Sequence, residues 1–335
     1  GAIHEIPDHV VVWNEEQRRE AAELHEVPMD RVKVTGAQAY DRWFNRRPST
    51  SWRSFCDKVS LPLDRPLLLY VCSSPFIAPN EVGLVRSWVK ELRSSPYQKL
   101  RTAGLLIRPH PQNAEQWRDE SLLAGIENVT IWPRHGANPV AQEARADYFD
   151  SMYYSAAVVG VNTSALIESG VIGRSVYTIL TDEFSGTQEE TLHFQHLKTV
   201  NGGLLHVASN LREHAEQLAR HTWTNADPKS LAFVKAFVRP NGLNTPAGKV
   251  FADTLEAMAK GPTREVSGKP LIRFVCRSTL YPIAALAKFF AGRRRVSRGT
   301  QSRAPGQKLK VLFVMQSPEY LRYYDSTVLA LSRKG

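Results

Sequence analysis

The sequence is poor in cysteine and lacks the segments that mark secretion or membrane insertion. Its 335 residues include three cysteines, Cys56, Cys72 and Cys276, an odd number without the spacing of metal ligands. This favours a reducing compartment over a disulfide-stabilised fold, and Cys72, inside an apolar run, is expected to be buried. The opening residues, GAIHEIPDH, show no signal peptide, and no apolar run is long enough for a transmembrane helix. We therefore expect a cytoplasmic protein.

Several catalytic and metal-binding motifs are also missing. The sequence has no GxxxxGK[ST], no G-x-S-x-G, no HExxH and no Asp-x-Asp pair that would hold a metal-bound nucleotide. Its 10 histidines show no zinc-like spacing. We therefore expect neither a metal ion nor a cofactor.

Positive charge is scarce in most of the chain, although the formal net charge is +10. Residues 263–335 contain 15 of the 43 Lys and Arg but 3 of the 33 Asp and Glu, a net +12, which leaves −2 for residues 1–262. The basic residues also lack the interleaved aromatic side chains of nucleic-acid-binding surfaces. We therefore expect no nucleic-acid partner.

What the sequence does contain is an alternation of apolar strands and amphipathic helices. Strands are predicted at 10–13, 32–35, 67–72, 104–107, 129–132, 156–161, 176–180, 204–208 and 310–315. Helices are predicted at 15–24, 81–92, from 113, at 148–154, 164–172, 210–221, 229–238, 246–259 and 320–332. Continuous apolar strands separated by such helices are typical of a doubly wound, Rossmann-like α/β fold with a parallel sheet covered on both faces.

Changes in composition divide the chain into five parts. We predict the end of one α/β domain at 1–45, a hinge at 46–66, the main α/β domain at 67–262, a basic linker at 263–307 and the start of a further α/β domain at 308–335. The first residue is not Met, and the last strand and helix have no partners, so we interpret the sequence as a piece of a longer protein.

Residues 271–295, apolar with scattered Arg and Lys, fit either a helix on the inner face of a membrane or an interdomain linker.

The sharpest local pattern joins the strand at 156–161 to the helix at 164–172. Asn162, Thr163 and Ser164 stand where the strand ends and the helix begins, and the free N–H groups of a helix N-terminus suit a phosphate. Glu168, one turn later, is placed to accept hydrogen bonds from a ribose diol. The structural alternative is an ordinary N-cap followed by a solvated glutamate.

A second cluster closes the strand at 104–107. In Arg108-Pro109-His110-Pro111 the prolines fix the backbone around His110. Arg108 and His110 together could bind a diphosphate, the first through its guanidinium and the second through one ring nitrogen. A histidine at the end of a strand can equally be a structural hydrogen-bonding residue.

Weaker candidates follow other strands. Gln188 and His193, in the segment 187–194, could contact the hydroxyls of a sugar, or the segment could be an exposed acidic start of a helix. Ser73 and Ser74 end the strand at 67–72. Gly36 ends the strand at 32–35 and could either approach a ligand or simply permit a tight turn.

The motifs RPHP and NTSALIE, in their order along residues 10–259, resemble the C-terminal, donor-binding domain of GT-B-type glycosyltransferases. The nearest groups in pattern are the CDP-glycerol glycerophosphotransferases and capsule polysaccharide transferases, and more distantly the UDP-N-acetylglucosamine 2-epimerases. The resemblance implies that His110, Thr163 and Ser164 bind the diphosphate of a donor, and that Glu168 binds its ribose. It also implies that residues 10–36 end an acceptor-side domain and that residue 310 begins another transferase.

The implied activity is metal-independent transfer from a nucleotide sugar or CDP-glycerol to a glycan or lipid-linked acceptor, in the synthesis of cell-surface polysaccharide. We name no catalytic base, because in such enzymes it commonly comes from the N-terminal domain. Two alternatives stay open: a UDP-sugar 2-epimerase, and a non-catalytic domain that binds nucleotide sugars.

Overall fold

The computed structural model describes residues 7–119, 123–221, 226–260, 311 and 323–333. The linker predicted at 263–307, with its candidate membrane segment at 271–295, and all but one residue of the strand predicted at 310–315 lie outside these residues. The strands are β1 (Val10–Val12), β2 (Val32–Val34), β3 (Leu67–Val71), β4 (Gly104–Arg108), β5 (Val129–Ile131), β6 (Ala157–Val159), β7 (Ser175–Ile179) and β8 (Leu205–Ala208).

The α-helices are α1 (Glu15–Glu23), α2 (Trp52–Val59), α3 (Glu81–Ser94), α4 (Gln98–Arg101), α5 (Gln142–Tyr153), α6 (Ser164–Val171), α7 (Ser185–Gln188), α8 (Leu192–Thr199), α9 (Leu211–Arg220), α10 (Pro228–Phe237), α11 (Ala247–Lys260) and α13 (Asp325–Ser332). Short 3₁₀ helices are η1 (Met29–Arg31), η2 (Gln38–Trp43), η3 (Pro111–Asn113), η4 (Glu115–Trp117), η6 (Asp182–Phe184) and η7 (Val200–Gly202).

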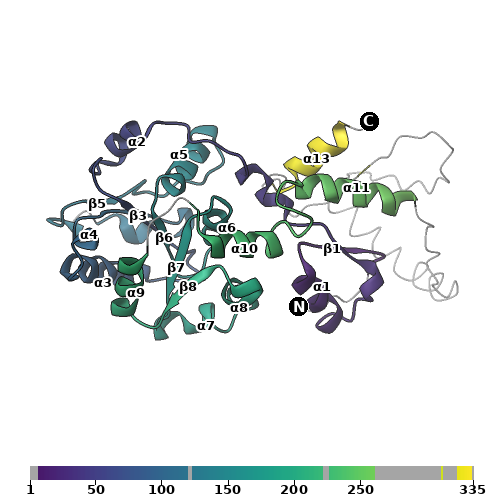
Figure 1. Ribbon diagram of the computed structural model, residues 1–335, viewed down its shortest axis with the longest axis horizontal. Coiled ribbons are helices and arrows are strands. Elements are labelled where there is room, and N and C mark those ends of the chain that lie inside the picture. The colour runs from purple at the N-terminus through teal and green to yellow at the C-terminus, as the bar shows by residue number, and fades with distance from the viewer. Residues whose placement is uncertain (1–6, 120–122, 222–225, 261–310, 312–322, 334–335) are drawn as a thin grey trace, which may run out of the picture.

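Six strands form one parallel sheet in the order β5-β4-β3-β6-β7-β8. The chain therefore builds one half of the sheet outward from β3 and then returns to build the other half from β6, and the strand order reverses between β3 and β6 (Figure 1). This confirms the predicted doubly wound, Rossmann-like class. A separate two-stranded parallel sheet pairs β1 with β2, and α1 packs against it.

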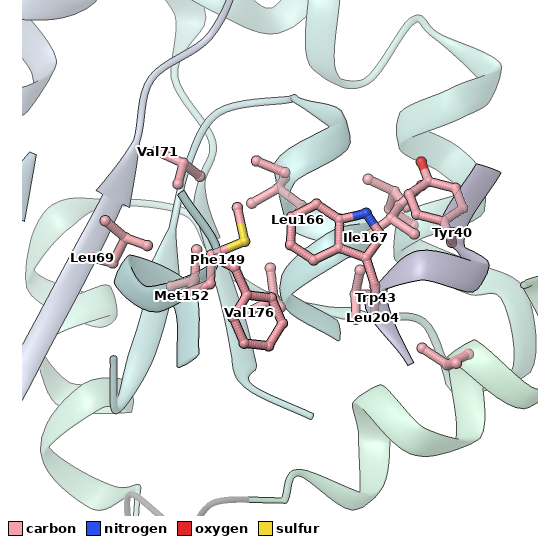
Figure 2. Close-up of a cluster of buried hydrophobic side chains, with 14 of the residues drawn as sticks. Tyr40, Trp43, Leu69, Val71, Phe149, Met152, Leu166, Ile167, Val176 and Leu204 are labelled. Carbon is pink, nitrogen blue, oxygen red and sulfur yellow. The ribbon is translucent and has the colours of Figure 1, made fainter. Parts of the chain in front are cut away.

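Both faces of the six-stranded sheet are covered, which explains why its central strands are apolar throughout. Along β3, Leu69 and Val71 face a cluster that includes Phe149 and Leu166, while Leu68 and Tyr70 belong to the cluster on the opposite face. Figure 2 shows the first cluster, in which side chains of α5 and α6 meet those of β3. Because alternate residues of a strand point to opposite faces, burial of every position on β3 requires helices on both sides.

Most of the predicted elements agree with the structure, although the short helices α4, α7 and α8 were not predicted. Three further differences have a local explanation. The helix α2 lies within the predicted hinge at 46–66. Its N-cap is Ser51, whose side chain accepts a hydrogen bond from Ser54 N, and the helix buries Phe55 and Val59. The helix α5 begins six residues before the predicted 148, without a capping side chain at Ala141 to announce it. The predicted helix from 113 is instead the pair of 3₁₀ helices η3 and η4.

The side chain of Asn113 accounts for the third difference. Its amide nitrogen donates hydrogen bonds to the carbonyls of Ser73 and Ala78 at 3.3 and 2.9 Å. The buried Asn113 side chain therefore fastens this segment to the loop after β3 instead of letting it wind into a regular helix. Among the helices that the structure describes, none combines the length and apolar character needed to cross a membrane.

Candidate functional site

A cavity of about 840 Å³ opens at the carboxyl end of the sheet, where the strand order reverses. Its floor includes Val71 and Cys72 at the end of β3, and the predicted burial of Cys72 is confirmed. The end of β4, the start of α6 and the segment η2 supply most of its walls. In doubly wound sheets ligands bind in the crevice at this position, because the loops after β3 and β6 diverge to opposite faces there. The fold thus places the cavity where a substrate site is expected.

Six of the predicted site residues line this cavity: Arg108, His110, Thr163, Ser164, Glu168 and His193. They come from β4, the loop after it, α6 and α8, and they are separated by up to about eighty residues in the sequence. The parallel arrangement of β4 and β6 on either side of β3 is what brings the first five to one edge.

The N-terminus of α6 faces the cavity. The Thr163 side chain accepts a hydrogen bond from Ala165 N at 3.5 Å, which makes Thr163 the N-cap, and Ser164 is exposed at the first helical position. Thr163 and Ser164 both retain hydroxyl protons that can be donated to an anion. Gly160, just before, lies so close to β3 that a Cβ atom there would stand 2.9 Å from Val71 O. This close approach sets the position of the loop.

His110 lies across the cavity on the loop after β4. Its Nδ1 accepts a hydrogen bond from Gln112 N at 3.2 Å, so the neutral ring carries its proton on Nε2. Partial burial lowers the pKa of His110 and keeps the ring neutral near pH 7. The imidazole is therefore held as a hydrogen-bond donor through Nε2, the role that a phosphate oxygen requires.

Arg108 is the most deeply buried cation that lines the cavity, with a side chain 4% exposed. Nη1 donates to Asp147 Oδ2 at 3.0 Å, and the guanidinium carbon lies 5.1 Å from the centre of the Tyr148 ring. Nη2 is buried and has no hydrogen-bond partner among the described residues. A buried cationic donor without an acceptor is costly, which makes Arg108 a candidate to bind an anion in the cavity.

Glu168 is buried on α6 and accepts a hydrogen bond from the Tyr148 hydroxyl at 2.7 Å. The Tyr148 hydroxyl stays protonated, because burial and the neighbouring Glu168 raise the pKa of Tyr148 well above its ordinary value. The carboxylate thus has a fixed orientation at the cavity wall, which suits an acceptor for vicinal hydroxyl groups.

Three predicted residues lie away from the cavity in structural roles. Gln188 is fully buried, donates to Ile179 O at 3.0 Å and accepts from Thr181 N at 3.3 Å. Asn162 is buried and donates to Thr187 O at 2.7 Å. The N–H of Ser73 donates to the buried carboxyl of Glu81 at 2.6 Å.

The other two predicted residues form turns. The carbonyl of Ser74 accepts hydrogen bonds from Ile77 N and Ala78 N, both at 3.0 Å. Gly36 has a φ of +88°, and a Cβ atom there would stand 2.9 Å from the Cβ of Ala247 and 3.0 Å from Val238 O. Its position permits the close approach of α11 rather than contact with the cavity.

Sequence reasoning did not identify several polar or aromatic residues that line the cavity, among them Trp13, Tyr40, Arg42 and Tyr148. Tyr148 stacks edge-on against Trp43, which is more than a hundred residues away in the sequence. No local pattern marks these side chains, because their neighbours are brought to them only by the docking of η2 and α5. The described residues contain no group of three or more His, Cys, Asp or Glu side chains placed to hold a metal ion.

The fold and cavity together define a Rossmann-like α/β protein with a cavity at the switch between its two half-sheets. In comparisons with known proteins, no family model and no curated protein matches the sequence. Among solved structures, the chain is similar to the wall teichoic acid polymerase TagF, with a TM-score of 0.45 and 15% identity over 75% of this chain and 59% of that one. It is also similar to the UDP-GlcNAc 2-epimerase of Methanocaldococcus jannaschii in complex with UDP-GlcNAc and UDP, with a TM-score of 0.47 and 12% identity over 75% of this chain and 61% of that one.

These proteins represent the two groups whose motifs the sequence resembles. The chain spans about three-fifths of the length of each.

Proposed function

We propose that the cavity binds the nucleoside diphosphate part of a donor, a nucleotide sugar or CDP-glycerol, and that the chain is the donor-binding half of a GT-B-type glycosyltransferase of cell-surface glycan synthesis. One observation supports this above all others: Arg108, the N-terminus of α6 and His110 all line one cavity. Each is a hydrogen-bond donor that keeps its proton at pH 7, and together they fit a diphosphate.

Glu168 supports the nucleoside part of this proposal. Diphosphate binding alone requires no acceptor, and a buried carboxylate would repel the phosphates if it stood among them. Glu168 follows Ser164 by about one turn of α6, roughly 5.4 Å along the helix axis, so it is placed beyond the helix terminus that would hold the phosphate. Its hydrogen bond from Tyr148 keeps the carboxylate directed along the cavity wall.

The chemistry that follows is displacement at the carbon or phosphorus of the donor with departure of a nucleotide. The donors of the cavity would stabilise negative charge on the leaving phosphate, the positive end of α6 and Arg108 by their fixed charges and His110 by its hydrogen bond. The proposed step uses no metal ion, since the sequence has no Asp-x-Asp pair to hold a metal-bound nucleotide. The group that deprotonates the acceptor is assigned to no residue of this chain.

Calorimetry tests the binding step directly. Titration of the chain with UDP, CDP and GDP, and with UDP-GlcNAc and CDP-glycerol, should give a dissociation constant in the micromolar range for at least one of them, and Arg108→Gln should abolish that binding. Folded protein that binds none of the five contradicts the proposal and favours a non-catalytic structural domain. Incubation of the protein with UDP-GlcNAc and no acceptor separates the remaining alternative, since only an epimerase would invert the configuration at C2 of the sugar.

A further inference from the structure

A network of three charged side chains, Arg108, Asp147 and Lys58, extends from the cavity to the surface of the domain. The Asp147 carboxylate, on α5, accepts a hydrogen bond from Arg108 Nη1 at 3.0 Å through Oδ2, and Lys58 Nζ lies 2.7 Å from Oδ1. The indole N–H of Trp132 donates to the same carboxylate at 3.2 Å. The three ionic groups come from β4, α5 and α2, so they join three elements that are far apart in the sequence.

The exposed fraction of the side chain falls from Lys58 to Asp147 to Arg108. The Lys58 side chain is 39% exposed, that of Asp147 is 10% exposed and that of Arg108 is 4% exposed. Only Arg108 lines the cavity. Lys58 also lies 5.8 Å from the centre of the Trp132 ring, which leaves the lysine little freedom to turn away from Asp147.

The charge balance of the three groups is what gives Lys58 a role. In an isolated pair, the carboxylate of Asp147 would cancel the charge of Arg108, and an anion in the cavity would gain little from the guanidinium. With Lys58 in place, two cations face one carboxylate, and the group keeps a net charge of +1 next to the cavity. Asp147 meanwhile fixes Arg108 through Nη1 and leaves Nη2 free.

We propose that Lys58 and Asp147 are positioning residues of the anion site: Asp147 orients the Arg108 guanidinium toward the cavity, and Lys58 offsets the charge of Asp147 so that a diphosphate is attracted. This inference rests on the proposed binding of a nucleoside diphosphate. It adds that a lysine outside the cavity, on a helix that contributes no lining residue, determines how strongly phosphates bind.

A series of charges at position 58 tests this inference. Dissociation constants for UDP, CDP and GDP, each paired with its uncharged nucleoside, would be measured by calorimetry on the wild type and on Lys58→Arg, Lys58→Met and Lys58→Glu. Lys58→Arg should bind the diphosphate as the wild type does, Lys58→Met about three- to tenfold more weakly, and Lys58→Glu more weakly still. Affinity for the nucleoside should stay within about twofold throughout.

The matched control is Lys90→Met, which removes an exposed lysine of α3 and should leave both affinities unchanged. Raising the salt concentration to about 1 M should reduce the difference between wild type and Lys58→Met, because salt screens charges that are partly exposed. A thermal unfolding curve for each variant shows whether α2 remains docked.

Two outcomes would overturn the inference. Equal diphosphate affinity in Lys58→Met and wild type shows that Lys58 sets no charge at the site. Equal weakening of diphosphate and nucleoside shows that the lysine acts only through packing of α2. If the wild type itself binds no nucleoside diphosphate, the proposed function is contradicted instead, so the two failures are distinguishable.

Discussion

Asp41 and Arg239 form a buried ion pair, with Oδ1 of the carboxylate 2.7 Å from a terminal nitrogen of the guanidinium. The same carboxylate accepts hydrogen bonds from the backbone N–H groups of Ala247 at 3.0 Å and Gly248 at 2.7 Å, so it also caps the N-terminus of α11. Asp41 lies on η2, which supplies a wall of the cavity. This pair therefore holds that wall against the segment after α10 and against the start of α11.

Asp41→Ala should destabilise the protein by about 3–5 kcal/mol, because it leaves the Arg239 guanidinium buried without its carboxylate and removes the cap of α11. Chemical denaturation measures the change. The matched control is Asp253→Ala, which breaks an exposed pair with Lys249 and should cost at most about 1 kcal/mol. Equal losses in the free energy of unfolding would show that the buried pair stabilises the protein no more than the exposed pair does.

Gly36→Ala should also destabilise the protein, by roughly 1–3 kcal/mol. The left-handed backbone at Gly36 disfavours a side chain, and the new methyl group would press against Ala247 and the carbonyl of Val238. Gly83→Ala is the matched control, because Gly83 lies within α3 with nothing within 4 Å of a Cβ atom, and the change should be stabilising by up to about 1 kcal/mol. A neutral Gly36→Ala variant would contradict the close approach of α11.

The buried carboxyl of Glu81 makes stability depend on pH. Burial raises the pKa of Glu81 to about 7, although hydrogen bonds from Ser73 and Tyr70 act in the opposite direction. Between the ordinary value of 4.5 and about 7 the folded protein binds more protons at this site than the unfolded chain, so the stability from Glu81 is present below pH 4.5 and is lost as the pH rises through 7.

Glu81→Gln removes this titration. From about pH 5 to about pH 7.5, the free energy of unfolding of the wild type should fall relative to that of Glu81→Gln by roughly 2–3 kcal/mol. Urea denaturation at the two pH values measures the difference, and Glu143→Gln, at an exposed position of α5, serves as the control. A constant difference across this range would mean that Glu81 titrates as an ordinary carboxyl.

His110→Ala and Ser164→Ala should each cost roughly 2–4 kcal/mol of transition-state stabilisation, because both remove donors to the leaving phosphate. The ratio kcat/KM for donor turnover measures the loss. His9→Ala and Ser87→Ala, which change exposed residues outside the cavity, should leave it unchanged. Unchanged turnover of both test variants would refute the assignment of the donor site.

The sequence alone was informative wherever a signal is local. The apolar strands predicted the sheet, and the run from Asn162 to Ser164 predicted the start of α6, because capping depends on residues only two or three positions apart. The prolines around His110 likewise predicted a fixed loop. Yet the same kind of polar residue at the end of a strand proved structural at Ser73 and Asn162, whose hydrogen-bond partners lie in other loops.

The order of apolar and polar residues predicts a parallel sheet and the edge of that sheet where the candidate site lies. Such a prediction is possible because the end of a strand and the start of a helix depend on residues that are consecutive in the sequence. The tertiary structure alone decided which polar side chains face the cavity. Tyr148, Asp147 and Lys58 acquire their roles from Glu168 and Arg108, which are 20 to 50 residues distant. Hydrogen bonds and ion pairs act over a few ångströms, so partners that are remote along the chain become visible only once packing of α2, α5 and η2 has brought them together.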